Sequence, residues 1–279
     1  MPMKFTDCLL IAALGLVSFA VHGQSLKTCL LERNPPYSQR SSASGIDHDI
    51  AAALAGALGR DFEAVWVPND PGIVEIDESD FPLRRLARAE CDVLLSVPGP
   101  ATDTLTGHDD LILGEPYYGA GFELVSCGAE LAPNLRGLRG RKVAIQSQTI
   151  AHFAMTMVKA KPQNFFSLDD AYAAVREGTV EAGVLWGPAI GALLSGQGGE
   201  QRCGLVEDYQ PPTAVRWNLH FAVRMESGRL TEQLNAALAT MRSSGQLQSI
   251  MRGYGVPPHA PFDSTYSLGA INDLQRPSR

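Results

Sequence analysis

Strand-like and helix-like segments alternate along most of this 279-residue chain, and the alternation restricts the possible folds more than any single motif does. Residues 93–97 and 180–185 are continuous apolar runs, which are typical of parallel strands buried on both faces. Between such runs apolar residues recur at helical spacing, as from Ile50 onward, with Asp47 as the expected N-cap and Gly59 as the stop. We predict an α/β fold in which mostly parallel sheets are flanked by helices.

Other segments extend this pattern. Residues 28–31, 62–67 and 142–146 are predicted strands, and Ser167 is the expected N-cap of a further helix because Asp170 follows it at capping-box spacing. The residues after Val256 are rich in Pro and Ser and show little periodicity, so we expect residues 257–279 to form a flexible tail.

The ligand crevice of such a fold lies at the carboxyl ends of the strands, which directs attention to the loops that follow each predicted strand. These loops carry hydrogen-bonding and aromatic side chains, as expected of a pocket that recognises a molecule without reacting with it. Taken singly, Trp186 could be core packing and Tyr37 a turn residue, and their joint placement at strand ends makes them candidates. The candidate cleft residues found in this way are Tyr37, Ser96, Gln146, Ser147, Gln148, Thr149 and Trp186.

The N-terminal residues 1–23 are predicted to be a signal peptide that directs the protein to the periplasm. Lys4 precedes an apolar run over residues 8–21, and small residues stand near Gly23, where a signal peptidase cleaves. The run of about 14 residues is too short to span a bilayer as a helix, although an anchored N-terminal helix is the alternative. The mature protein is expected to begin near Gln24.

Export changes how the remaining cysteines are interpreted, since disulfides form in an oxidising compartment. Three pairings of Cys29, Cys91, Cys127 and Cys203 are possible. We favour Cys29–Cys91, which flank predicted strands of one half of the chain, and Cys127–Cys203, which both lie in its middle. Buried free thiols are the alternative.

Several function classes find no support in the sequence. The net charge of −7 and the lack of a basic cluster disfavour nucleic acid as a partner. No glycine-rich nucleotide motif, nucleophile elbow or zinc-protease motif occurs, and the histidines beside Asp47 and Asp109 fit solvated segments better than metal sites. We therefore predict a protein that is not an enzyme, with no catalytic residue, metal site or cofactor.

A series of motifs, in this order, resembles the periplasmic binding proteins that serve polar amino-acid ABC transporters. The resemblance covers nearly all of the chain from residue 24 to about residue 256. The motifs are Asn34-Pro-Pro-Tyr37-Ser38, Gly45-Ile-Asp-His-Asp49-Ile50, Glu115-Pro-Tyr-Tyr118, and residues 138–146 and 171–182.

This resemblance implies a type II periplasmic binding protein with two lobes, a hinge of two crossing strands and a ligand between the lobes. Lobe 1 is expected to comprise residues 24–118 and 219–256, and lobe 2 residues 119–218. Alignment with the family adds Thr104 and Tyr117 to the candidate cleft residues.

The chain departs from the family at the positions that hold an amino acid. The arginine that pairs with the ligand carboxylate is replaced by Gly107, and the aspartate that binds the amino group by Trp186. The Gly-Thr-Thr that caps the carboxylate reads Gln148-Thr149-Ile150. A zwitterion without these partners loses several kcal/mol of charge pairing in a water-poor cleft, so ordinary amino-acid binding is disfavoured.

A narrower group fits better. Cys29, residues 91–98, Trp186-Gly187-Pro188 and residues 252–257 together resemble the solute-binding homologues associated with PQQ-dependent quinoprotein dehydrogenases of methanol and alcohol oxidation. This resemblance implies an accessory role, with the dehydrogenase and its cytochrome c as partners. The first alternative is the receptor of an ABC permease for a small neutral, aromatic or amino-acid-like solute. The second is an enzyme on the same scaffold, such as a dehydratase acting through Ser96 or Gln146.

Overall fold

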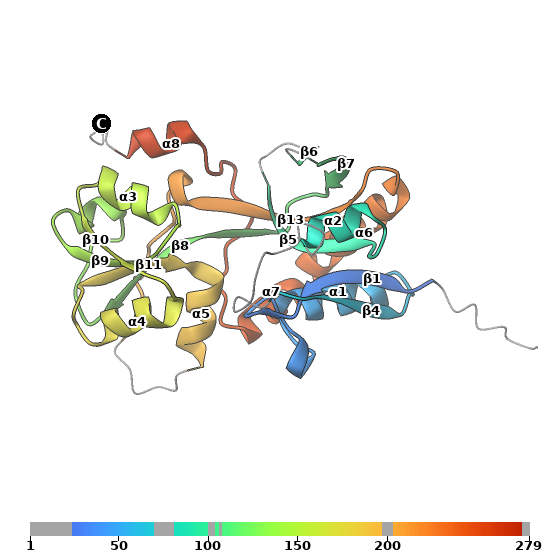
Figure 1. The fold of residues 1–279 in the computed structure, drawn as a ribbon, viewed down its shortest axis with the longest axis horizontal. Coiled ribbons are helices and arrows are strands. Elements are labelled where there is room, and N and C mark those ends of the chain that lie inside the picture. Colours follow the sequence, from blue (N-terminus) through green and yellow to red (C-terminus); the bar gives the residue numbers. More distant parts are fainter. Residues whose placement is uncertain (1–23, 70–80, 100–103, 106–107, 197–202, 275–279) are drawn as a thin grey trace, which may run out of the picture.

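A computed structural model of the chain describes residues 24–69, 81–99, 104–105, 108–196 and 203–274, so the predicted signal peptide lies outside the described residues. The fold is α/β, as predicted. Two groups of strands and helices are joined by a pair of long strands (Figure 1). The path through the main sheet runs β10-β9-β11-β8-β13-β5-β1-β4.

The first group, which we call lobe 1, contains the β4-β1-β5 end of this path. Strand β1 pairs in parallel with both β4 and β5, and β7 pairs with β13 and with β6. Its strands are β1 (Leu26–Leu31), β2 (Arg33–Asn34), β3 (Ser38–Gln39), β4 (Phe62–Val67), β5 (Val93–Gly99), β6 (Thr104–Leu105) and β7 (His108–Leu113). Its helices are α1 (Ile46–Ala57), α2 (Pro82–Ala87), α6 (Gly228–Ser243) and α7 (Gln246–Gly253).

The second group, lobe 2, contains the β10-β9-β11 end. Strand β9 pairs in parallel with β10 and β11, and β12 pairs antiparallel with β8. Its strands are β9 (Lys142–Gln146), β10 (Lys161–Phe165), β11 (Ala182–Trp186) and β12 (Cys203–Leu205). Its helices are α3 (Ala151–Met157), α4 (Leu168–Arg176) and α5 (Gly187–Ser195). The short helix α8 (Leu268–Asp273) packs beside α3, although it comes from the end of the chain (Figure 1).

The lobes are linked by β8 (Tyr118–Cys127) and β13 (Arg216–Arg224). These strands pair antiparallel with each other through residues 118–121 and 216–219. Beyond that pairing β8 continues into lobe 2, where it pairs with β11, and β13 continues into lobe 1, where it pairs with β5. The predicted lobe boundaries, 118/119 and 218/219, fall inside these strands and stay a prediction.

Each lobe has its own hydrophobic core. One large cluster in lobe 1 packs α1, α6 and α7 on the sheet, and one in lobe 2 packs α3 and α8 on β9 and β11. Among the described residues, the partly buried Trp186 packs against both of these clusters. The two cores therefore meet at the end of β11.

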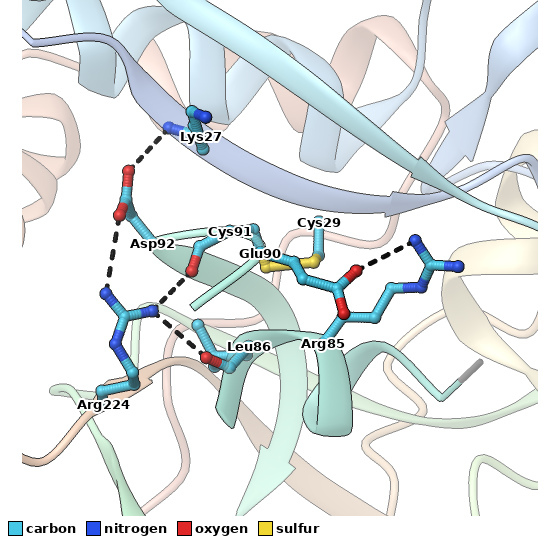
Figure 2. The surroundings of a disulfide bond; sticks show 8 residues. All are labelled: Lys27, Cys29, Arg85, Leu86, Glu90, Cys91, Asp92 and Arg224. Carbon is cyan, nitrogen blue, oxygen red and sulfur yellow. Dashed lines mark hydrogen bonds and ion pairs between the residues drawn. A yellow bond between two sulfur atoms is a disulfide. The ribbon is translucent and has the colours of Figure 1, made fainter. Parts of the chain in front are cut away.

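Both favoured disulfides, Cys29–Cys91 in lobe 1 and Cys127–Cys203 in lobe 2, are present. The first lies among polar contacts that hold β1, α2 and β5 together, as Figure 2 shows. Arg224 donates from Nη1 to the carbonyl oxygens of Leu86 (3.1 Å) and Cys91 (2.6 Å). Its Nη2 lies 3.7 Å from the carboxylate of Asp92, which also accepts the backbone N–H of residue 27 on β1. These contacts hold the segment from α2 to the start of β5 against β1 and β13.

Two expectations from the sequence are wrong. Gly45 is the N-cap of α1, while Asp47 is buried and its carboxylate accepts a hydrogen bond from Ser96. Residues 257–274, expected to be part of a flexible tail, are packed along β8 and β13 and end in α8. Ser167, by contrast, caps α4 as predicted, since its Oγ accepts the N–H of Asp170 at 3.1 Å.

Candidate functional site

A cavity of about 710 Å³ opens between the carboxyl ends of β1 and β5 and the start of α2. Its walls are mostly apolar and include Leu30, Leu95 and Val97. Lobe 1 supplies nearly all of the described residues that line it, and lobe 2 contributes Trp186. The site is therefore a pocket of lobe 1 with one side chain of lobe 2 at its edge.

The polar end of the cavity is organised around Asp47 and Ser96. Ser96 Oγ donates to Asp47 Oδ1 at 2.5 Å. Asp47 is only 7% exposed, and this burial raises the pKa of its carboxyl from 3.8 to about 7, while the hydrogen bond from Ser96 acts in the opposite direction. Burial thus favours the neutral, protonated form of this carboxyl over the carboxylate.

The position of Ser96 follows from an irregularity in the sheet. Leu95 and Ser96 of β5 stand opposite the single residue Phe221 of β13, which is a β-bulge. Ser96 has a φ of 52°, in the left-handed region that non-glycine residues seldom adopt. Its N–H leaves the ladder and donates to Tyr117 Oη at 2.9 Å. The bulge therefore directs Ser96 at Asp47 and fixes it on Tyr117, a buried phenol whose pKa is raised by burial.

Trp186 closes the other side of the cavity by reaching across to lobe 1. Its indole N–H donates to Tyr37 Oη at 2.8 Å. Tyr37 lies in the turn between β2 and β3. Its carbonyl packs against Gly45, where any side chain would collide with it. Burial raises the pKa of Tyr37, so the phenol is neutral at physiological pH. The contact is a hydrogen bond between neutral groups of opposite lobes.

An aromatic cluster holds the indole from behind. Trp186 contacts Phe122 and Trp217 edge-on, with ring centroids 5.5 Å and 6.0 Å away. Trp217 in turn stacks on Tyr266 at 5.2 Å. Such pairs add to the free energy gained by area burial alone. The cluster therefore ties the Trp186 ring to both linking strands and to the C-terminal segment.

The structure brings only some of the predicted cleft residues together. Tyr37, Ser96 and Trp186 line the cavity, and Tyr117 lies against Ser96. The lobe 2 candidates at the end of β9 do not line it: Gln148 is exposed, and Thr149 Oγ1 donates to the carbonyl of Gln146. Ser147 likewise lies outside the lining residues. Thr104 begins β6, and its side chain is not among those that the structure describes, nor is Gly107.

Sequence reasoning missed Asp47 and Arg84, which are the lining residues of the described chain that can carry a charge at neutral pH. Asp47 was interpreted as a helix cap because aspartate is common there, and its burial depends on the distant Ser96. Arg84 lies on α2 at the rim, and helical periodicity does not indicate which face of α2 meets the cavity.

Among the described residues, no group of three or more His, Cys, Asp or Glu side chains could hold a metal ion. In the same part of the chain no helix is long and apolar enough to cross a membrane.

No protein-family model matches the chain. It is 23% identical over 261 residues to protein MoxJ of Methylorubrum extorquens AM1, a match that covers 84% of this chain and 81% of MoxJ. The sequence is thus similar to that of MoxJ over most of both chains.

Solved structures agree on the fold. The L-cystine solute receptor of Neisseria gonorrhoeae, in its unliganded open conformation, matches with a TM-score of 0.71 at 14% identity, over 86% of this chain and 96% of the receptor. MxaJ of Methlophaga aminisulfidivorans MPT matches with a TM-score of 0.63 at 17% identity, over 84% of this chain and 100% of MxaJ. The chain therefore has the two-lobed α/β fold of the periplasmic solute-binding proteins, and its sequence is similar to that of MoxJ.

Proposed function

We propose that the protein is a periplasmic accessory factor of a PQQ-dependent methanol or alcohol dehydrogenase system, with the dehydrogenase and its cytochrome c as partners. The observation that carries this proposal is the place of Trp186, whose indole reaches the opposite lobe and binds Tyr37. The similarity to MoxJ and the motifs shared with quinoprotein-associated homologues support the same assignment. The proposal includes export through residues 1–23.

The physical argument concerns what a solute receptor requires. Such a receptor binds its ligand between lobes and closes around it, so ligand contacts must replace water rather than side chains of the protein. Here the Tyr37 hydroxyl already accepts a hydrogen bond from Trp186, and Asp47 is satisfied by Ser96. A zwitterionic solute entering this site would break these two hydrogen bonds. Position 107 is a glycine, so no arginine stands there to pair with the carboxylate of the solute. The cleft is therefore better suited to holding the lobes in a fixed arrangement than to binding and releasing a solute.

Gene deletion in the producing organism tests the proposal. Loss of this protein is expected to reduce the assembly or activity of the periplasmic quinoprotein dehydrogenase, measured with an artificial electron acceptor in periplasmic extracts. Re-expression of the full chain should restore activity. Purified residues 24–279 should also bind the purified dehydrogenase in a calorimetric titration. Unchanged dehydrogenase activity and assembly in the deletion strain would overturn the proposal.

A second candidate function is the receptor of an ABC permease, which the cavity itself favours. About 710 Å³ of mostly apolar space remains beside Trp186, enough for a small neutral or aromatic solute. A thermal-shift screen of such metabolites tests this candidate, since selective binding to the folded state raises the unfolding temperature. A shift that Ser96→Ala abolishes would favour the receptor, and a screen without shifts would count against it.

The dehydratase alternative has less support because its two expected polar residues are separated. Ser96 lines the cavity and is hydrogen-bonded to Asp47, whereas Gln146 does not line it. Turnover of a cyclic acid that Ser96→Ala removes would be the result that restores this alternative.

A further inference from the structure

The chain does not end in lobe 1 after α7 but crosses to lobe 2. We call residues 256–274 the C-terminal strap. Val256 at its start belongs to the hydrophobic core of lobe 1, and Ile271 near its end belongs to that of lobe 2. Figure 1 shows the strap running from α7 past the linking strands to α8, which lies beside α3. One short segment is thus anchored in both cores.

Between these anchors the strap lies against β8. Tyr118 Oη donates to the carbonyl of Pro257 at 2.9 Å, and the N–H of Gly119 donates to the carbonyl of His259 at 3.2 Å. His259 Nε2 lies 2.7 Å from a carboxylate oxygen of Glu123, whose side chain is 3% exposed. Glu123 belongs to the part of β8 that pairs with β11 of lobe 2. The contacts with β8 therefore extend from its lobe 1 end into lobe 2.

The strap also pairs with β13. The side chain of Asn218 donates to the carbonyl of Phe262 at 2.9 Å and accepts its N–H at 2.7 Å, as a neighbouring strand would. Arg216 stacks over the Phe262 ring at 4.5 Å and donates to the carbonyl and hydroxyl of Ser264. Both linking strands are thus bonded to the same segment.

Two glycines permit this close approach. A side chain on Gly119 would collide with the carbonyl of Ala260 and with the Phe262 ring. On α5 of lobe 2, a side chain at Gly191 would collide with the carbonyl of Gly255 and the ring of Pro257. The strap therefore fits a surface without side chains at these two points, and any added atom must displace it.

We propose that the C-terminal strap is a brace that holds the two lobes at one angle and suppresses hinge closure. Closure of a two-lobed binding protein changes the backbone of the linking strands relative to both lobes. A segment bonded to β8 and β13 and buried in both cores must detach before such a change. This inference concerns the conformation of the chain alone and does not depend on the proposed partner.

The test measures the distance between the lobes in purified residues 24–279. Spin labels are placed on Ala57→Cys at the end of α1 and Gln163→Cys on β10, both exposed, while the four other cysteines are paired in disulfides. Gly119→Ala displaces the strap without removing any of its residues. Gly204→Ala is the matched control, because a side chain there meets no atom within 4 Å.

The brace predicts a narrow distance distribution for the parent and for Gly204→Ala, and one about twice as wide for Gly119→Ala. A folded Gly119→Ala protein with the parent distribution would overturn the inference, as would a broad distribution in the parent.

Hydrogen exchange keeps the test decisive if Gly119→Ala folds poorly. In the parent protein the N–H groups of Gly119, Phe262 and Tyr266 are expected to exchange slowly. The first donates to the strap carbonyl of His259, and the other two belong to the strap and donate to β13. Deletion of residues 257–279 should leave the β9 amides protected and widen the interlobe distribution. Exchange of the Phe262 and Tyr266 amides at the rate of an unstructured peptide in the parent would overturn the inference.

Discussion

Within the described residues, two regions outside the linking strands connect the lobes, and their contacts differ in kind. In the cleft, the partly exposed side chain of Trp186 packs against the core of lobe 1 and donates one hydrogen bond to Tyr37. Along the C-terminal strap, it consists of backbone hydrogen bonds, the buried His259–Glu123 pair and a residue in each core. We infer that the cleft contact occupies part of the cleft, whereas the strap fixes the angle between the lobes.

The largest effect is expected at the buried pair of the strap. His259→Ala leaves the carboxylate of Glu123 buried without a partner and should lower the free energy of unfolding by about 3–5 kcal/mol. Denaturant unfolding of residues 24–279 measures this loss. The control is His152→Ala, because the ring of His152 contacts Asn164 at an exposed position. This change should lower the free energy of unfolding by less than about 1 kcal/mol.

A double variant sharpens this result. Adding Glu123→Gln to His259→Ala removes the stranded carboxylate, so part of the lost stability should return. If His259→Ala costs no more than His152→Ala, the His259–Glu123 pair stabilises the fold no more than an exposed contact does, and the comparison fails.

The cleft should differ from the strap in its dependence on pH. The folded-state pKa of Asp47, about 7, lies above its ordinary value of 3.8, so folding favours the protonated carboxyl. This contribution is complete below about pH 4 and is lost as the pH rises through about 7, a change of up to roughly 4 kcal/mol. Thermal unfolding of the parent at pH 4 and pH 8 measures it.

Asp47→Asn should flatten this dependence, while Asp61→Asn, an exposed control, should leave it unchanged. A parent and an Asp47→Asn protein with the same pH dependence would show that the carboxyl does not titrate in this range.

The smallest effect is expected for the cleft contact itself. Trp186→Phe keeps an aromatic ring but removes the donor to Tyr37, and should lower the free energy of unfolding by about 1 kcal/mol. Trp217→Phe is the matched control, because its indole N–H has no hydrogen bond to the described residues. A loss much larger than that of His259→Ala would reverse the comparison.

The sequence allowed much of the frame to be predicted. Strands β4 and β9 have the predicted bounds, Ser167 caps α4, and both favoured disulfides formed. These features depend on local periodicity, on capping chemistry or on which half of the chain a cysteine lies in. Such signals are carried by residues close together in the sequence.

The features that were missed depend on contacts between distant residues. The strap is held largely by backbone carbonyls, such as those of Pro257 and His259, which any sequence presents, and by the absence of a side chain at Gly119. Asp47 is buried because a bulge 49 residues later turns Ser96 toward it. Helix α5 was not predicted because Gly187 and Pro188 after a strand also suit a loop.

The central claim is that Trp186 bonds across the cleft to Tyr37 and that the lobes keep one angle. The most direct test is the interlobe distance of labelled residues 24–279, measured first alone and then with saturating mixtures of free amino acids and small neutral metabolites. The account predicts one narrow distribution that no mixture shifts. A shift to a shorter distance with any of them would contradict it, because it would show a cleft that still closes around a solute.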